Sequence, residues 1–175
     1  MQALEVWKAV TMDRSNFLDH LIALLAEHNI RYCVIGGQGV NAYVEPLISL
    51  DLDLVVAVNQ LELVESLLGR HFKLERFAHS LNISAAGSDL RVQIQTDSRY
   101  FEFADRAAVR DVLGVPMPVA RKEDILQGKI WAASDPKRRP SKRRKDLLDI
   151  ERLLETFPEL QAHVPAEIRD WLSRI

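Results

Sequence analysis

The sequence predicts an α/β protein, in which a mixed β-sheet is flanked by helices and followed by a C-terminal helical segment. Strand-like and helix-like segments are interspersed before residue 120, whereas only helix-like segments follow it. The segment LDLDLVVAV (50–58) alternates as a strand does, and AGSD (86–89) marks a hairpin turn between two strand-like runs. We therefore expect an α/β core over residues 1–120 and a helical extension packed on it over residues 121–175.

The first elements follow from hydrophobic spacing and turn residues. Residues 15–30 place leucines at helical intervals, and RYCVI (31–35) is typical of a strand that ends at a Gly-Gly pair. A short helix over 38–44 and the strand over 50–58 come next. The segment 59–71 is a helix for which Asn59 would be the N-terminal cap.

The later elements include three strands, over 73–78, 80–86 and 90–96, and then a short helix over 99–109. Residues 110–120 are expected to form one final strand, which Pro116 and Pro118 would place at the edge of the sheet. Three helices should complete the chain, over residues 122–134, 144–157 and 166–175.

The composition excludes several classes of protein. With 47% hydrophobic and 27% charged residues, the chain is not globally disordered, and its net charge of −2 leaves nucleic-acid binding to a local patch. Cys33 is the one cysteine and lies in an apolar run, which is typical of a core residue. No apolar run approaches the ~20 residues of a membrane span, and no signal sequence is evident. We expect a cytoplasmic protein without a membrane partner.

The chemistry is suggested by Asp51 and Asp53, which lie on the same face of one strand, roughly 6.5–7 Å apart. Two buried like charges need compensation, and carboxylates are ligands that Mg²⁺ prefers, with Mn²⁺ as the alternative. Gly36 and Gly37 end the preceding strand, where the backbone can approach a ligand closely, and the amides opening a helix at Gln38 would face an anion. Together these features suit a nucleoside triphosphate (NTP) carrying the metal.

Each half of this pattern is weak alone, because Asp-x-Asp is common on solvent-facing strands and Gly-Gly is more often a turn. In combination, GGQGVNAYVEPLISLDLDLVV resembles the signature of the nucleotidyltransferase superfamily that includes DNA polymerase beta. It is most similar to the minimal nucleotidyltransferases and their AbiEii-like toxin relatives. The resemblance continues through LGVPMPVARKEDILQGKIWAASDP and SKRRKDLLDIERLL, and so covers residues 15–157.

This resemblance implies Mg²⁺-dependent transfer of a nucleotidyl group from an NTP to a hydroxyl of a small molecule, a protein or an RNA. It implies metal ligation by Asp51 and Asp53, neutralisation of the triphosphate by Lys129, and orientation of Lys129 by Asp146. Several relatives belong to toxin–antitoxin or defence pairs, so a cognate toxin or antitoxin protein is a further expected partner.

The sequence departs from the family pattern in one important place. The resemblance calls for a third carboxylate where Gln93 stands. A glutamine can lend its carbonyl oxygen to a metal, but it carries no charge and cannot act as a base. Asp89 or Asp97 could substitute if the strand register differs. Leu47 and Ile48 replace a basic residue that often precedes the acidic pair. We therefore expect NTP binding to survive better than transfer, and a nucleotide- or RNA-binding module is the alternative function.

Other interpretations stay open at this point. Lys129 could extend from a helix edge into solvent, and Asp146 with Asp149 could simply favour the dipole at a helix start. The basic run Lys137–Lys145 could bind RNA or be a solvated surface. A metal-dependent glycosyltransferase would also use Asp-x-Asp, but it leaves the Gly-Gly pair unexplained.

Overall fold

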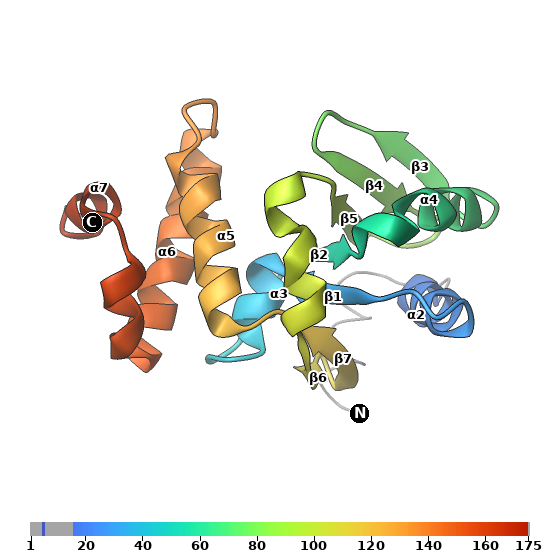
Figure 1. Ribbon diagram of the computed structural model, residues 1–175, viewed down its shortest axis with the longest axis horizontal. Helices are drawn as coiled ribbons and strands as arrows, with labels where there is room; N and C mark the ends of the chain where they lie inside the picture. Colours follow the sequence, from blue (N-terminus) through green and yellow to red (C-terminus); the bar gives the residue numbers. More distant parts are fainter. Residues whose placement is uncertain (1–4, 6–15, 175) are drawn as a thin grey trace.

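The computed structural model describes residue 5 and residues 16–174, so the start of the first expected helix, at residue 15, lies outside the described residues. The centre of the molecule is a mixed seven-stranded sheet with the order β3-β4-β5-β2-β1-β7-β6 (Figure 1). This is the predicted α/β class. The strands are β1 (Tyr32–Ile35), β2 (Asp51–Val56), β3 (Lys73–Arg76), β4 (Ser80–Ser84), β5 (Arg91–Gln95), β6 (Ala108–Val112) and β7 (Val115–Val119).

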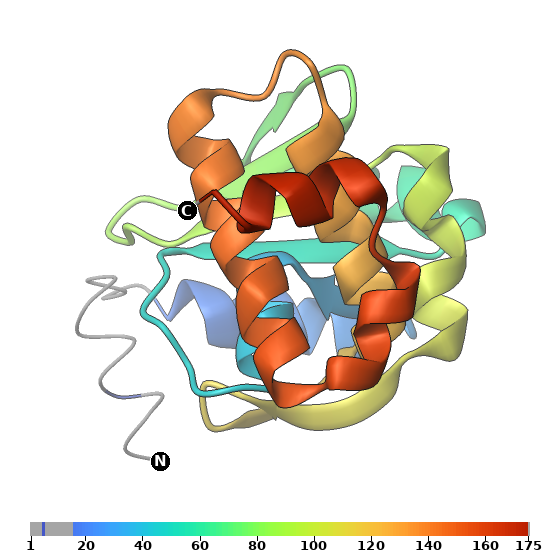
Figure 2. The same ribbon diagram turned by 90° about the vertical axis from the view of Figure 1, so that its left-hand side faces the viewer.

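The helices lie on both sides of this sheet. Helices α2 (Phe17–Glu27) and α4 (Leu61–Gly69) are together on one side, and α5 (Lys122–Ser134), α6 (Pro140–Thr156) and α7 (Ala166–Leu172) are on the other (Figures 1 and 2). The short helix α3 (Gly36–Asn41) contacts β2, α5 and α6. Three 3₁₀ segments, η1 (Val58–Gln60), η2 (Ser98–Arg106) and η3 (Pro158–His163), complete the connections.

Alternation along the strands separates an apolar face from a polar one. Leu52, Leu54, Val92 and Ile94 are buried in the core, whereas Asp51, Asp53 and Gln93 between them are partly exposed. Strands β4 and β5 pair antiparallel around the AGSD turn, as predicted. Cys33 is fully buried, and burial raises the pKa of its thiol to about 12, which fits the expected core role.

The prediction for residues 110–120 was wrong. They form part of a hairpin, because Leu113 and Gly114 both have positive φ, as a two-residue primed turn requires. β7 is therefore an inner strand and β6 is the edge. The prolines are tolerated because Pro116 and Pro118 occupy alternate positions whose nitrogens face away from β6, and β1 uses the amide of Ala120 instead.

Three helix starts also differ from the prediction. α6 begins at Pro140, so Asp146 and Asp149 lie well inside the helix, and the helix-dipole interpretation of these two residues fails. Pro at the first helical position was an available signal. Asn59 is part of η1 and does not cap α4, and α3 begins at Gly36, before Gln38. The segment 99–109 is divided between η2 and β6.

Helices α5 and α6 pack on α3, but a domain division at residue 120 stays a prediction. Among the described residues, no helix combines the length and apolar character that crossing a membrane would require.

Candidate active site

The two acidic residues of β2 open into one cavity. Asp51 and Asp53 line a cavity of ≈ 250 Å³ together with Gly37 of α3 and Lys142 and Lys145 of α6. Their strand alternates, so both carboxylates face this cavity while Leu52 between them faces the core. Both residues of the pair are therefore accessible from the same cavity.

The two carboxylates have different environments. Asp51 forms an ion pair with Arg91 on the neighbouring strand, with 2.7 Å between its Oδ1 and the arginine Nε. Burial raises the pKa of Asp53 to about 6, an effect that Lys129 opposes and the negative charge of Asp51 reinforces. The charged form of Asp53 is thus disfavoured unless a cation lies beside it.

Gly36 and Gly37 do different things at the end of β1. Gly36 has φ +64°, and a Cβ there would lie 2.1 Å from Oδ2 of Asp53, so a side chain would displace the acid. A Cβ on Gly37 would meet nothing within 4 Å. Gly36 therefore makes room for Asp53, whereas Gly37 leaves open backbone at the cavity wall.

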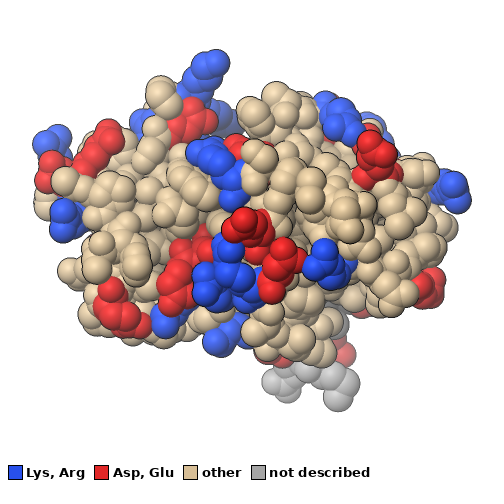
Figure 3. All heavy atoms as spheres, viewed as in Figure 1, with Lys and Arg blue, Asp and Glu red and all other residues tan. Residues whose placement is uncertain are grey.

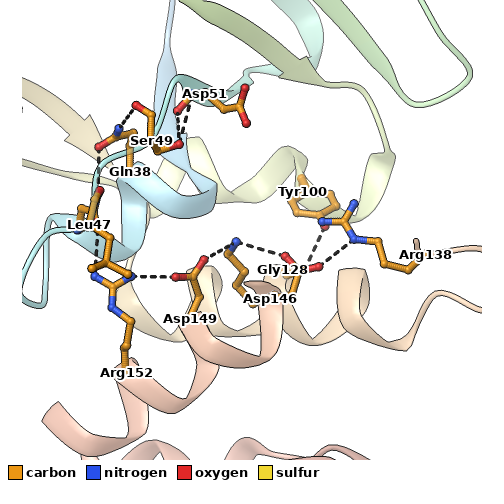
Figure 4. A network of polar contacts seen from close by, with 12 residues as sticks. Gln38, Leu47, Ser49, Asp51, Tyr100, Gly128, Arg138, Asp146, Asp149 and Arg152 are labelled. Atoms are coloured by element: carbon orange, nitrogen blue, oxygen red, sulfur yellow. Dashed lines mark hydrogen bonds and ion pairs between the residues drawn. The ribbon is translucent and has the colours of Figure 1, made fainter. Parts of the chain in front are cut away.

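A buried group of charged side chains joins α5 to α6 and to the loop between them, and we call it the ionic network. Figure 4 shows its contacts running from Arg152 through Asp149 and Asp146 to Arg138. The Nζ of Lys129 lies 2.7 Å from Oδ2 of Asp149 and 3.3 Å from Oδ1 of Asp146. The members of the ionic network are Lys129, Arg138, Asp146, Asp149 and Arg152.

Lys129 therefore does not extend into solvent, since its side chain is 12% exposed. Burial acts to lower its pKa, but the neighbouring carboxylates of Asp149 and Asp146 outweigh this and raise the pKa. Lys129 is held charged at the wall of the cavity that Asp51 and Asp53 also line. Lys129 contacts Asp146, as the expected orientation requires, but Asp149 lies closer.

The ionic network also fixes the loop that leads into β2. Arg152 donates to Oδ1 of Asn41 at 3.0 Å and to the carbonyl of Glu45. Asn41 in turn bonds both the amide and the carbonyl of Leu47. Gln38 is 1% exposed, and its Nε2 donates to the carbonyl of Ser49 at 3.3 Å (Figure 4). The side chain of Gln38 thus holds the end of the loop that precedes β2.

The basic run Lys137–Lys145 is divided between several tasks. Arg138 pairs with Asp146 at 2.8 Å, and Arg143 donates to the carbonyls of Ala133 and Asp135 at the end of α5. Only part of the run is thus available to a ligand, including Lys142 and Lys145 at the cavity. On the face in Figure 3, acidic and basic side chains are intermixed, without one continuous basic field.

The third carboxylate is not supplied by the predicted substitutes. Gln93 pairs with Asp53 in register, as expected, so it stands beside the acidic pair. Asp97 lies beyond the end of β5, where it bonds Arg99 and caps η2. Asp89 is exposed in the AGSD turn. Within the described residues, no group of three or more His, Cys, Asp or Glu side chains is arranged to hold a metal ion.

Sequence reasoning missed Arg91, Arg138, Asp149 and Arg152 as parts of this site. The spacing of Asp146, Asp149 and Arg152 along one helix would have shown that they share a face. Arg91 could be placed next to Asp51 only from the parallel pairing of β2 with β5. Arg138 lies in a loop, where periodicity gives no signal.

No protein-family model matches the chain, and no curated protein sequence matches it. The chain does match solved structures. The resistance factor ANT(2″)-Ia in complex with adenylyl-2″-tobramycin matches with a TM-score of 0.61 at 13% identity, over 91% of this chain and 96% of that chain. The lincosamide antibiotic adenylyltransferase LnuA, lincomycin-bound, matches with a TM-score of 0.54 at 12% identity, over 82% and 99%.

These similarities agree with the resemblance seen in the sequence motif. They come from the whole sheet and its helices, since each alignment covers most of both chains. At such low identity they concern the arrangement of the backbone. The chain has the nucleotidyltransferase fold.

Proposed function

We propose that the protein transfers a nucleotidyl group from an NTP to a hydroxyl acceptor in the presence of Mg²⁺ or Mn²⁺. The observation that carries this proposal is the shared cavity of Asp51, Asp53 and Gly37, which Lys129, Lys142 and Lys145 also line. Two acids suited to a hard cation thus share one cavity with basic groups suited to phosphate.

The residues present fit one metal ion better than two. Mg²⁺ is commonly bound through one or two carboxylates with substrate phosphates and waters completing its shell, and Asp51 with Asp53 meets that need. A second ion would need a further charged ligand, and Gln93 stands at that position. When bound, the metal would supply neutralisation of the triphosphate charge.

The side chains would then position the reactants. Gly37 leaves backbone accessible to the phosphates, and Lys129, Lys142 and Lys145 neutralise them. In the transfer, the acceptor oxygen forms a bond to the α-phosphorus, the bond to the bridging oxygen breaks, and pyrophosphate leaves. The hydroxyl proton passes to water. Such transfers depend mostly on positioning and electrostatics, so activity can persist with only two carboxylates.

The acceptor is proposed to be a small molecule. The similar structures were solved with adenylyl-2″-tobramycin and with lincomycin bound, and both of these are small molecules. RNA binding through residues 137–145 and a toxin or antitoxin partner stay weaker proposals. We expect the protein to act in the cytoplasm, where NTPs are abundant.

A second candidate function is nucleotide binding without turnover, and the presence of Gln93 beside Asp53 specifically favours it. The two functions are separated by incubating the protein with each α-labelled NTP, Mg²⁺ and a panel of hydroxylated small molecules. Label transfer that disappears in Asp53→Asn supports the enzyme. Mg²⁺-dependent NTP binding without transfer to any acceptor, including RNA and the protein itself, supports the binding module.

A further inference from the structure

We propose that the hydroxyl acceptor binds across β5, β4 and β3, and that it is a cationic molecule rich in hydrogen-bond donors and about two sugar rings long. This inference rests on the proposed function, because it assigns the second substrate of the same site. It is carried by three side chains, Gln93, Asn82 and Glu75, which we call the polar row.

The polar row extends from the acidic pair across β5, β4 and β3, and these strands neighbour one another in the sheet (Figure 1). Asp53 on β2 pairs with Gln93 on β5, Gln93 pairs with Asn82 on β4, and Asn82 pairs with Glu75 on β3. Side chains at directly paired positions point to the same face of a sheet. The polar row therefore starts beside Asp53 and continues in a line away from it.

The side chains of the polar row lack partners. Within the described part of the chain, none of the three makes a side-chain hydrogen bond or ion pair, and Oδ1 of Asn82 is buried with nothing to accept from. Most buried polar atoms in native proteins are satisfied, so this orphaned acceptor is a position that a water molecule or a ligand donor would satisfy. A carbonyl and a carboxylate require a ligand that donates O–H or N–H.

The same residues line a groove that is continuous with the acidic pair. Asp53, Gln93, Asn82 and Glu75 all contribute to its wall. Two arginines also line it, but each is already paired: Arg91 with Asp51 and Arg138 with Asp146.

The two ends of the groove carry opposite charges. Lys142 on α6 is at the end shared with the phosphate cavity, whereas Glu75 is at the β3 end. An anionic triphosphate and a cationic acceptor would thus be drawn to opposite ends. This polarity disfavours an RNA acceptor, whose phosphates would lie beside Glu75.

The spacing of strands sets the length of the acceptor. Neighbouring strands are about 4.8 Å apart, so Glu75 lies about 14 Å from Asp53 and Asn82 about 10 Å from it. A molecule whose reacting hydroxyl sits near Gln93 must extend about 10 Å to bring an amine to Glu75. One sugar ring, at about half that length, reaches only Asn82.

The test uses probes that share one skeleton and differ in charge or length. Binding to the full chain is measured by calorimetry for the β-1,4-linked glucosamine disaccharide, its neutral counterpart cellobiose, monomeric glucosamine and a single-stranded RNA decamer. We expect the amino disaccharide to bind more tightly than the other three. NTP affinity is measured in the same preparations, since its loss would count against the proposed function separately.

Two variants localise the binding. Glu75→Gln should weaken binding of the amino disaccharide about fivefold and leave binding of cellobiose unchanged, because only the charge pair is lost. Asn82→Leu should weaken binding of both disaccharides about tenfold. Glu62→Gln, an exposed glutamate on α4, is the matched control and should change neither. NTP binding should be unaffected in all three, which also reports that they fold.

Some results would overturn the inference. Absence of amino-disaccharide binding in a protein that still binds NTP would leave the proposed function standing and remove this acceptor. Affinity that does not respond to Glu75→Gln and Asn82→Leu would place the acceptor elsewhere. RNA binding that strengthens in Glu75→Gln would assign the groove to a polyanion.

Discussion

Two polar regions meet at Asp53, and they differ in how completely their side chains are paired. In the ionic network, Lys129 contacts two carboxylates, and Asp149 bridges it to Arg152. In the polar row, Gln93, Asn82 and Glu75 have no partner among the described residues. The first region is complete without a ligand, whereas the second has hydrogen bonds still to make.

This difference indicates a division of labour. A saturated buried network holds its members in one geometry, and here it also fixes the loop before β2 through Arg152 and Asn41. An unsaturated row costs stability that a ligand can restore. We therefore propose that the ionic network side positions the NTP and that the polar row binds the acceptor, and four perturbations test that contrast.

The largest effect is expected for Lys129→Met. Removing the buried ammonium leaves Asp146 and Asp149 with less compensation, which should lower the free energy of unfolding by about 3–5 kcal/mol. Urea denaturation measures it. Lys145→Met on the exposed side of α6 serves as the control and should change stability little. A small loss for Lys129→Met would mean that the ionic network is not a saturated unit.

The next effect concerns pH. The pKa of Asp53 in the folded protein is about 6 against an ordinary value of 3.8, so folding favours its protonated form. The contribution of protonated Asp53 to the free energy of unfolding is fully present below about pH 4. It is lost as pH rises through 6, a change of about 2–3 kcal/mol. Without divalent metal, the free energy of unfolding of Asp53→Asn relative to wild type should therefore rise between pH 4 and 6. Above pH 6 this difference should stay constant. A difference independent of pH would contradict the burial of Asp53.

A smaller effect is expected for Gln93→Asp, which restores the third carboxylate beside Asp53. Transfer should accelerate about tenfold because the acceptor proton gains a base, while NTP affinity changes less. Gln93→Asn has the same length without the charge and is the matched control. Equal rates for the two variants would show that the missing carboxylate does not limit turnover.

The smallest effect has the opposite sign to the first. Asn82→Leu replaces an orphaned buried carbonyl with an apolar group of similar size, so the free energy of unfolding should rise by about 1 kcal/mol. Chemical denaturation of both proteins without ligand provides the measurement. Destabilisation by this substitution would indicate that Asn82 is already satisfied, and the contrast between the two regions would lose its basis.

Some elements of the fold and of the site could be predicted from the sequence, and others could not. Local periodicity located the helix over 122–134 with both bounds, and alternation put Asp51 and Asp53 on one face. Residues 110–120 were misassigned because the turn at Leu113 depends on two positive φ values in a segment without a strong turn pair. The start of α6 was missed although Pro140 signalled it.

The polar row could not be derived from spacing in the sequence. Glu75, Asn82 and Gln93 come together through the registers of three strands, and a shift of one residue would turn any of them to the apolar face. The ionic network was partly visible, since Lys129 and Asp146 follow from the family resemblance. Arg138 and Arg152 became recognisable only once α5 and α6 were packed together.

The central claim is that Asp51 and Asp53 hold the metal that accompanies an NTP, and calorimetric titration of ATP with and without Mg²⁺ tests it most directly. Wild type should bind ATP well only with Mg²⁺. The variant Asp51→Asn/Asp53→Asn should lose that dependence and, without metal, bind ATP at least as well as wild type, because two repelling charges are gone. ATP binding that is equally metal-dependent in both proteins would contradict the account.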